Sequence, residues 1–354
     1  GQHDDAVKSY KQALAIKPDF ADAHNTLGVA LKNLGQLKAS IKSFKKALVI
    51  KPDYVEAHNN LGMALIDLGQ LDEALISCSH AITLKPDFEY MFGTILNTKM
   101  KLCLWDDLAK QLDELTNKIN NGEKAIVPFS MLGLNDDPEL LRKVAEIHAN
   151  HKCPQNHILS KIERYPKHKK IRIGYFSADF RNHPVSYLTA ELYEVHDRSQ
   201  FEIYGFSFGL GAEDEITLRI KAGVDHFYDV HTMSYKDVAM LARSIELDIA
   251  VDLGGYTQDS RTEIFAMSAA PIQLGYIGYL GTMGANYYDY LVADQTIIPE
   301  KNQKYYSEKV VYLPSYQVND SKQSPPATIF TRQDIGLPEE GFVFCCFNNT
   351  YKIT

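Results

Sequence analysis

The strongest constraint on the fold of this chain is a 34-residue repeat near its start. Lys-Pro-Asp followed by an aromatic residue recurs at residues 17–20, 51–54 and 85–88, and Gly-Gln recurs at 1–2, 35–36 and 69–70. A fixed period of this length is the signature of a repeat array, in which each unit is one supersecondary structure. We therefore expect stacked repeats over residues 1–88.

Each repeat has the pattern of two antiparallel helices. Apolar residues recur at helical spacing in two groups, which are Ala23, Leu27, Ala30, Leu31 and Leu34, and then Ala39, Phe44, Ala47 and Leu48. Gly35 and Gly69 stand where the first helix ends in a left-handed turn, and a proline follows the second helix. Such a pair buries its apolar face only by stacking on its neighbours, so the sequence predicts an α-solenoid.

A 34-residue period with this pattern resembles the tetratricopeptide repeat. The resemblance implies a concave groove that binds protein partners. Asn25, Asn59 and Asn60 fall on the first helix of their units and are our candidates for lining the groove. The alternative is that they are ordinary exposed polar residues of a helix.

The charge balance limits the partners. Lys and Arg number 37 against 45 Asp and Glu, a net charge of −8, which argues against non-specific binding to nucleic acid or to an anionic membrane. No apolar stretch approaches the roughly 20 residues that cross a bilayer. Five scattered cysteines suit neither a disulfide framework nor a zinc site, so we expect no metal and a reducing, cytoplasmic setting. They are Cys78, Cys103, Cys153, Cys345 and Cys346.

Residues 89–168 lose the period but keep helical patterning, and we expect a helical cap and connector there. Asp137 and Pro138 form a helix start, with Asp137 as the cap and Pro138 at the first helical position. The Lys- and His-rich stretch 165–170 marks the end of the connector. We interpret it as a solvated linker and not as a nucleic-acid site.

From residue 169 to 338 the pattern alternates between strands and helices, which predicts a parallel, Rossmann-like α/β lobe with helices on both faces of its sheet. We expect strands at 171–176, 201–208, 226–230, 248–253, 272–276, 290–293 and 309–313, and helices at 184–195, 213–221 and 235–245. Ligands of such sheets bind at the carboxyl ends of the strands, so the loops that follow the strands are the candidate site.

Two segments of the lobe carry candidate catalytic side chains. The loop after the first strand brings His183 to a helix start, where an imidazole suits general-base or hydrogen-bonding work; the alternative is that Asn182 or His183 only caps the helix. Asp248 and Asp252 lie on one strand at an even spacing, so a regular strand turns both to one face. They are candidate catalytic carboxylates, or else Asp252 caps the next turn and Asp248 starts the strand.

Glycines mark two of the loops. Gly254 and Gly255 follow Asp252, and a second series at steps of three comprises Gly275, Gly278, Gly281 and Gly284. Glycine allows a backbone to approach a ligand closely. The chain has no Gly-x-Gly-x-x-Gly fingerprint, so a bound dinucleotide has no support.

In their order along the chain, these motifs resemble the O-linked N-acetylglucosamine transferase family that carries tetratricopeptide repeats, including its Spindly-like and bacterial members. The resemblance is carried by residues 174–180, 182–184, 255–257, 270–273, 278–282, 289–290, 293–294, 306–309, 347–348 and 351–352. It implies a GT-B glycosyltransferase, with residues 169–338 as the first lobe and 339–354 as the opening strand of a nucleotide-binding lobe. Leu280 stands where the family commonly has Pro.

The same resemblance implies a metal-independent, inverting sugar transfer that needs no cofactor. His183 would match the family's active-site His, and Lys352 would match its Lys at the donor diphosphate. The other donor-binding residues would be Gly255, Tyr256, Thr257, Gly278, Tyr279, Gly281, Thr282 and Tyr351.

The sequence thus predicts a protein O-glycosyltransferase that moves N-acetylglucosamine from UDP-GlcNAc to Ser or Thr hydroxyls of proteins recruited by the repeats. Two alternatives stay open: a non-catalytic scaffold with a vestigial transferase lobe, and the same chemistry with GDP-fucose as donor. The chain opens inside a repeat and stops soon after a strand-like run. We therefore interpret it as a fragment and expect it to be inactive alone.

Overall fold

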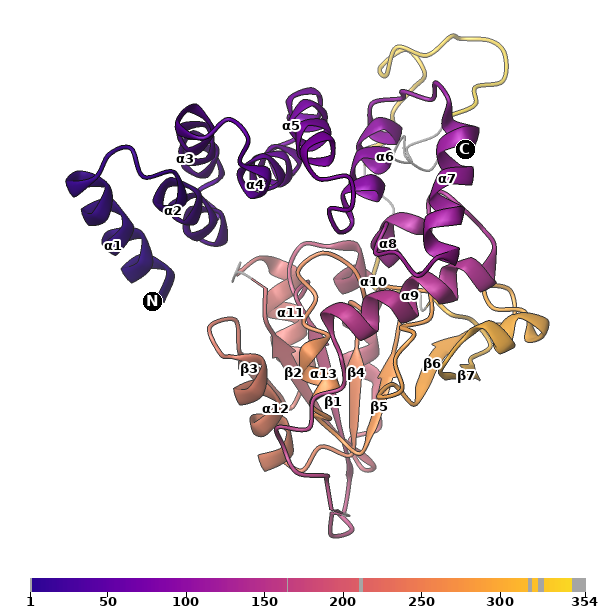
Figure 1. Cartoon of the computed structure of the whole chain (residues 1–354). Coiled ribbons are helices and arrows are strands. Elements are labelled where there is room, and N and C mark those ends of the chain that lie inside the picture. The colour runs from indigo at the N-terminus through magenta and orange to yellow at the C-terminus, as the bar shows by residue number, and fades with distance from the viewer. Residues whose placement is uncertain (1, 164, 210–212, 318–319, 324–327, 346–354) are drawn as a thin grey trace. The chain divides into compact units, whose positions relative to one another are not determined.

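The computed structural model describes residues 2–163, 165–209, 213–317, 320–323 and 328–345. They form two compact units, divided between Asp136 and Asp137, and each unit is described here by itself (Figure 1). Among the described residues, no helix has both the length and the apolar character that spanning a membrane requires.

The first unit is a succession of helices. They are α1 (Gln2–Ile16), α2 (Ala21–Asn33), α3 (Leu37–Ile50), α4 (Val55–Asp67), α5 (Leu71–Leu84), α6 (Met91–Lys101), α7 (Leu108–Asn120) and α8 (Pro128–Met131). The pairs α2–α3 and α4–α5 are the predicted repeat units. Between their helices Gly35 and Gly69 have φ of +71° and +78°, the left-handed geometry expected there. The predicted α-solenoid is confirmed.

The recurring Lys-Pro-Asp-aromatic motif has a structural explanation. In each copy the Lys ammonium lies over the ring of the aromatic residue, at 5.2 Å for Lys17 on Phe20, 4.6 Å for Lys51 on Tyr54 and 5.7 Å for Lys85 on Phe88. At exposed sites a cation–π contact of this kind stabilises by about 0.5–1 kcal/mol. The motif therefore fastens the turn between one repeat and the next.

The second unit is built on a parallel sheet. It contains α9 (Pro138–Lys152), β1 (Ile171–Ser177), α10 (Pro184–Val195), β2 (Phe201–Ser207), α11 (Glu215–Gly223), β3 (His226–Asp229), α12 (Tyr235–Ser244), β4 (Ile249–Asp252), α13 (Glu263–Ala266), β5 (Ile272–Gly275), β6 (Tyr290–Ala293), a 3₁₀-helix (Glu300–Tyr305) and β7 (Lys309–Tyr312). Among the described residues the strands form one seven-stranded sheet in the order β3-β2-β1-β4-β5-β6-β7. Every neighbouring pair is parallel, which confirms the predicted Rossmann-like lobe.

Each face of the sheet has its own buried core, because successive strand residues point to opposite sides. On β1, Phe176 packs into the core that α9, α12 and α13 cover, and Tyr175 packs into the core that α10 and α11 cover. Tyr193 of α10 is fully buried in the second core. With both faces covered, the carboxyl edge of the sheet is where its loops reach solvent.

Helix α9 begins as predicted. The Asp137 carboxylate accepts the Glu139 amide at 2.9 Å, and Pro138 is the first helical residue. Ala145 and Ala149 of this helix, which falls in the predicted connector, are buried in a core of the sheet unit. The predicted bounds of the connector, residues 89–168, stay a prediction. The strand expected within residues 339–354 stays a prediction, because residues 342–345 are described without a strand and residues 346–354 lie outside the described ranges.

Candidate active site at the carboxyl edge of the sheet

His183 lies where the loop after β1 enters helix α10. It is the N-cap of the helix, in an extended conformation, and Pro184 follows at the first helical position. Its ring Nδ1 accepts the Val185 amide at 3.3 Å. The side chain stays 36% exposed, so the residue caps the helix without being enclosed. The capping alternative for His183 is therefore confirmed, and its catalytic role stays a prediction.

Asp179 stands beside this imidazole. One carboxylate oxygen lies 3.6 Å from Nδ1 of His183, and the other accepts from the Arg181 guanidinium at 3.2 Å. A neutral ring whose Nδ1 accepts a hydrogen bond carries its proton on Nε2, so His183 offers a donor to a substrate oxygen. In the other neutral tautomer, Nδ1 carries the proton and faces Asp179, and Nε2 is the ring's acceptor.

Asp252 organises a turn. It is the last residue of β4 and only 3% exposed. One oxygen accepts the amides of Gly254 at 2.9 Å and Gly255 at 3.0 Å, and the other accepts the Tyr288 hydroxyl at 2.5 Å. Burial raises the pKa of this carboxyl. These contacts show Asp252 capping the turn after β4, which was the alternative left open, and its catalytic role stays a prediction.

Asp248 is not part of this edge. It precedes β4, and its carboxylate accepts the Arg172 amide at 2.9 Å and lies 3.2 Å from Nδ1 of His168, from the predicted linker. Asp248 lies just before the amino end of β4 and Asp252 is its last residue, so the two candidate carboxylates lie at opposite ends of the strand. The catalytic role of each stays a prediction. An even spacing predicts that two side chains point to the same face of a sheet, but it does not predict at which end of the strand each residue lies.

The glycines serve packing between two loops. A Cβ on Gly278 would lie 2.1 Å from the Leu253 carbonyl oxygen, and one on Gly255 would lie 2.5 Å from Cβ of Tyr279. Gly255 also has φ of +56°, which side-chain-bearing residues rarely adopt. We expected these glycines to allow a ligand to approach; in the structure they allow the turn after β4 and the loop after β5 to approach each other.

Most of the predicted donor-binding side chains in these loops are buried. Tyr256, Tyr279 and Thr282 are enclosed, Gly281 lies against the Tyr279 hydroxyl, and Tyr256 donates to the Met283 carbonyl at 2.7 Å. Thr257, Gly278 and Leu280 keep partly exposed surface. The donor-binding role of the whole set stays a prediction. Tyr351 and Lys352 lie outside the described residues.

The three asparagines of the repeats form a chain of side-chain contacts. The Asn60 amide donates to the Asn25 oxygen at 3.0 Å, and the Asn59 amide donates to the Asn60 oxygen at 3.3 Å. Asn25 is 8% exposed, while Asn59 and Asn60 are partly exposed. They come from α2 and α4, the first helices of their repeats, as predicted. Their role in binding a partner stays a prediction.

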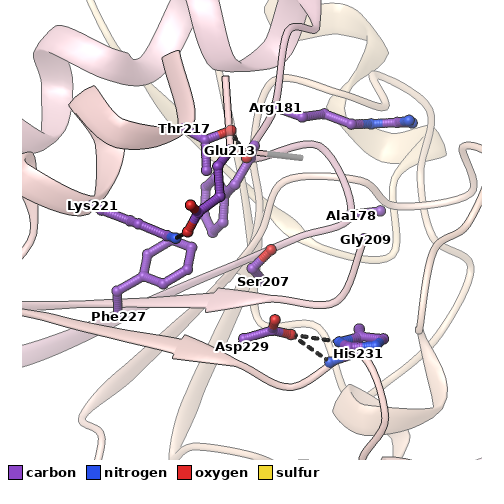
Figure 2. Close-up of a pocket in the computed structure, with 11 residues that line it drawn as sticks. Ala178, Arg181, Ser207, Gly209, Glu213, Thr217, Lys221, Phe227, Asp229 and His231 are labelled. Carbon is purple, nitrogen blue, oxygen red and sulfur yellow. Dashed lines mark hydrogen bonds and ion pairs between the residues drawn. The ribbon is translucent and has the colours of Figure 1, made fainter. Parts of the chain in front are cut away.

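A cavity of about 410 Å³ opens at the carboxyl ends of β1, β2 and β3 (Figure 2). Its charged side chains are largely paired: Lys221 bonds to Glu213 at 2.9 Å and His231 to Asp229 at 2.8 Å. Arg181, from the loop that leads to His183, also lines it. Sequence reasoning missed the cavity because its lining comes from several separate segments that share no motif.

Two further residues make structural contacts at this edge, and they were not selected as site residues from the sequence. Asp179 was included only as part of the 174–180 motif, and Glu308 only as part of the 306–309 motif. An acidic residue three or four positions before a capping His is a usable signal for the first. Nothing local distinguishes Glu308 from an exposed surface Glu. Within the described ranges, no group of three or more His, Cys, Asp or Glu side chains is placed to hold a metal ion.

Comparison with known proteins places this site in a family. The model of glycosyl transferase family 41 matches residues 139–328, more than half of the chain. The chain belongs to glycosyl transferase family 41. Tetratricopeptide-repeat models match residues 1–35, 31–69 and 55–88, ahead of the family 41 region.

Relatives of this family 41 chain include two curated proteins. A probable UDP-N-acetylglucosamine–peptide N-acetylglucosaminyltransferase SEC from Arabidopsis thaliana is 36% identical over 281 residues, covering 73% of this chain and 29% of that protein. A UDP-N-acetylglucosamine–peptide N-acetylglucosaminyltransferase from Caenorhabditis elegans is 31% identical over 189 residues, covering 52% and 15%. The chain thus spans less than a third of the length of either relative.

A solved structure shares the architecture. A mutant of the Thermobaculum terrenum O-GlcNAc transferase superposes with a TM-score of 0.59 and 26% sequence identity. The superposition covers 91% of this chain and 55% of that one.

Proposed function

We propose that this family 41 chain is part of a protein O-GlcNAc transferase, which moves N-acetylglucosamine from UDP-GlcNAc to Ser or Thr hydroxyls of proteins bound by the repeats. The observation that carries the proposal is His183, an imidazole at a helix N-terminus on the carboxyl edge of the family 41 lobe, with Asp179 3.6 Å away. The relatives' names, which describe peptide N-acetylglucosaminyltransferases, support the substrates.

The two states of His183 suit two tasks in such a transfer. With its proton on Nε2 the ring donates to a substrate oxygen and orients it. With Nδ1 donating to Asp179, Nε2 accepts the proton of the attacking hydroxyl, which is a weak nucleophile without a base. The buried Asp179 then stabilises the imidazolium that forms.

Charge that builds on the departing diphosphate needs cations or amide donors near it. We assign this task to Lys352, on the strength of the resemblance alone, and propose that the transfer needs no metal ion. The repeats would supply the protein acceptor, with Asn25, Asn59 and Asn60 as candidate contacts.

The decisive experiment offers the full-length protein a mixture of acceptor proteins with UDP-GlcNAc or GDP-fucose, and measures the added mass by mass spectrometry. We expect N-acetylhexosamine on Ser or Thr from UDP-GlcNAc, with the same yield in excess EDTA. Addition of deoxyhexose alone would establish the fucose alternative. No addition from either donor would favour the scaffold.

Two substitutions separate the chemistry of His183 from its capping. His183→Asn keeps a cap, because the Asn side-chain oxygen can accept the Val185 amide, whereas His183→Ala also loses about 1 kcal/mol of helix stability. We expect both to lower kcat by about a hundredfold or more. Full activity in His183→Asn, measured with the same donor and acceptor, contradicts a catalytic His183.

A further inference from the structure

Three consecutive residues before β7 hold the glycine-rich loop, defined here as residues 278–284, which follows β5. They are Tyr306, Ser307 and Glu308. Each of them makes a hydrogen bond to this loop, although more than twenty residues of sequence lie between the partners.

Glu308 makes the central contacts. Its side chain is 5% exposed. One carboxylate oxygen accepts the Thr282 hydroxyl at 2.7 Å, and the other accepts the Met283 amide at 2.6 Å. Each oxygen therefore fixes a different group of the glycine-rich loop, one from a side chain and one from the backbone.

Thr282 extends the network. Its hydroxyl oxygen accepts the amides of Ser307 and Gly284, both at 3.1 Å, and lies 3.0 Å from the Ser307 hydroxyl. At the other end of the loop, the Tyr306 hydroxyl donates to the Leu280 carbonyl at 3.2 Å. Residues 280, 282, 283 and 284 are thus all held through the segment 306–308.

This arrangement links the loop's shape to a buried charge. Leaving a buried carboxylate without partners is costly, so the loop cannot depart from this conformation while Glu308 stays enclosed. Burial raises the pKa of Glu308, and the donors of Thr282 and Met283 oppose that shift. At Leu280, the hydrogen bond from Tyr306 restrains the backbone.

We propose that Glu308 is a positioning residue for the sugar-nucleotide donor. By fixing Thr282 and the Met283 amide, it keeps the partly exposed Gly278 and Leu280 in the shape that the donor meets. This inference rests on the proposed function, because it assigns the donor to the glycine-rich loop. Glu308 itself acts through the loop and does not touch the substrate.

The first test measures the loop without any activity. Hydrogen–deuterium exchange is followed over residues 278–284 in the present chain, its Glu308→Gln variant and a Glu300→Gln control, in which an exposed Glu at the start of the 3₁₀-helix is changed in the same way. We expect exchange at the loop to rise about tenfold or more in Glu308→Gln only. Unchanged exchange would show that Glu308 does not hold the loop.

The second test separates positioning from simple stability. In the full-length enzyme, Glu308→Gln should raise KM for UDP-GlcNAc about tenfold, with KM for the acceptor and the melting temperature close to those of Glu300→Gln. Thr282→Val should reproduce the effect, and Thr282→Ser, which keeps the hydroxyl, should restore the donor KM. If Glu308→Gln does not fold, the comparison of Thr282→Val with Thr282→Ser tests the same proposal.

The outcomes distinguish this inference from the proposed function. A lower melting temperature with an unchanged donor KM makes Glu308 merely structural and overturns the positioning role. If the wild-type protein transfers no sugar, the proposed function is overturned and the donor role of Glu308 is overturned with it, even when Glu308→Gln speeds exchange in the loop. The anchoring of the loop then stands on the exchange data alone.

Discussion

At the scale of single residues, the sheet unit uses buried carboxylates to order backbone. Asp252 accepts two amides and a tyrosine hydroxyl, and Glu308 accepts one amide and a threonine hydroxyl. Both carboxylates are buried, whereas the side chains of His183 and His231 at the same edge stay more than a third exposed. The buried carboxylates at this edge therefore set loop geometry.

A second histidine, His148, makes the stability of the sheet unit depend on pH. His148 of α9 lies edge-on to Tyr256, with 4.8 Å between ring centroids. Burial lowers its pKa from the usual 6.5 to about 4, and Lys152 and His151 act in the same direction. In the unfolded chain His148 therefore becomes protonated as the pH falls below 6.5, whereas in the native protein it stays neutral until about pH 4.

We expect the contribution of His148 to the free energy of unfolding to be complete above pH 6.5 and to fall by about 1–3 kcal/mol toward pH 4. His148→Gln should reduce this dependence, since Gln does not titrate. Urea denaturation of both proteins at pH 7.5 and 4.5, compared as differences between the two pH values, checks the prediction. Equal pH dependence in the two proteins contradicts it.

Part of the candidate site could be predicted from residue identities alone. His183 was predicted because its motif places an imidazole at a helix start, and the structure puts it there. Asp248 was assigned with Asp252 because strand parity says nothing about which end of the sheet a residue occupies. Glu308 could not be recognised, since its burial depends on the loop after β5 folding over it.

At the scale of elements, two loops interlock at the carboxyl edge, and glycine makes this possible. In Gly278→Ala the new Cβ meets the Leu253 carbonyl at 2.1 Å, so backbone must shift. Gly275→Ala is the matched control from the same series, because its Cβ meets only Cδ1 of Leu291, at 3.2 Å. We expect about 2–3 kcal/mol of destabilisation for Gly278→Ala and under about 1 kcal/mol for Gly275→Ala, measured by chemical denaturation. Similar values for the two would refute the interlock.

Elements were the most predictable level of this structure. The predicted helix at 184–195 and strand at 290–293 coincide with α10 and β6, because both are bounded by clear apolar and turn signals. Short α13 and the 3₁₀-helix were not predicted, since a single turn has no periodicity to detect.

At the scale of the whole molecule, each unit has its own core. Leu65 is buried among the repeats, and Ile203 is buried in the sheet unit. We expect Leu65→Ala to lower the free energy of unfolding of the repeats by about 2–5 kcal/mol. Ile203→Ala should lower the free energy of unfolding of the sheet unit by a similar amount. Calorimetry, with circular dichroism of each variant, assigns the transitions. If both substitutions shift one common transition equally, the two units unfold as one.

The strand order also has a consequence during synthesis on the ribosome. Ile173 of β1 pairs with Ile203 on one side and with Ile249 on the other. Helix pairs of the repeats close on contacts between neighbours and can fold as each pair leaves the exit tunnel, while β1 waits with an open edge until β4 has been translated. Open edges recruit other strands. The nascent sheet unit therefore exposes an unpaired strand edge for longer than the helix pairs of the repeats do.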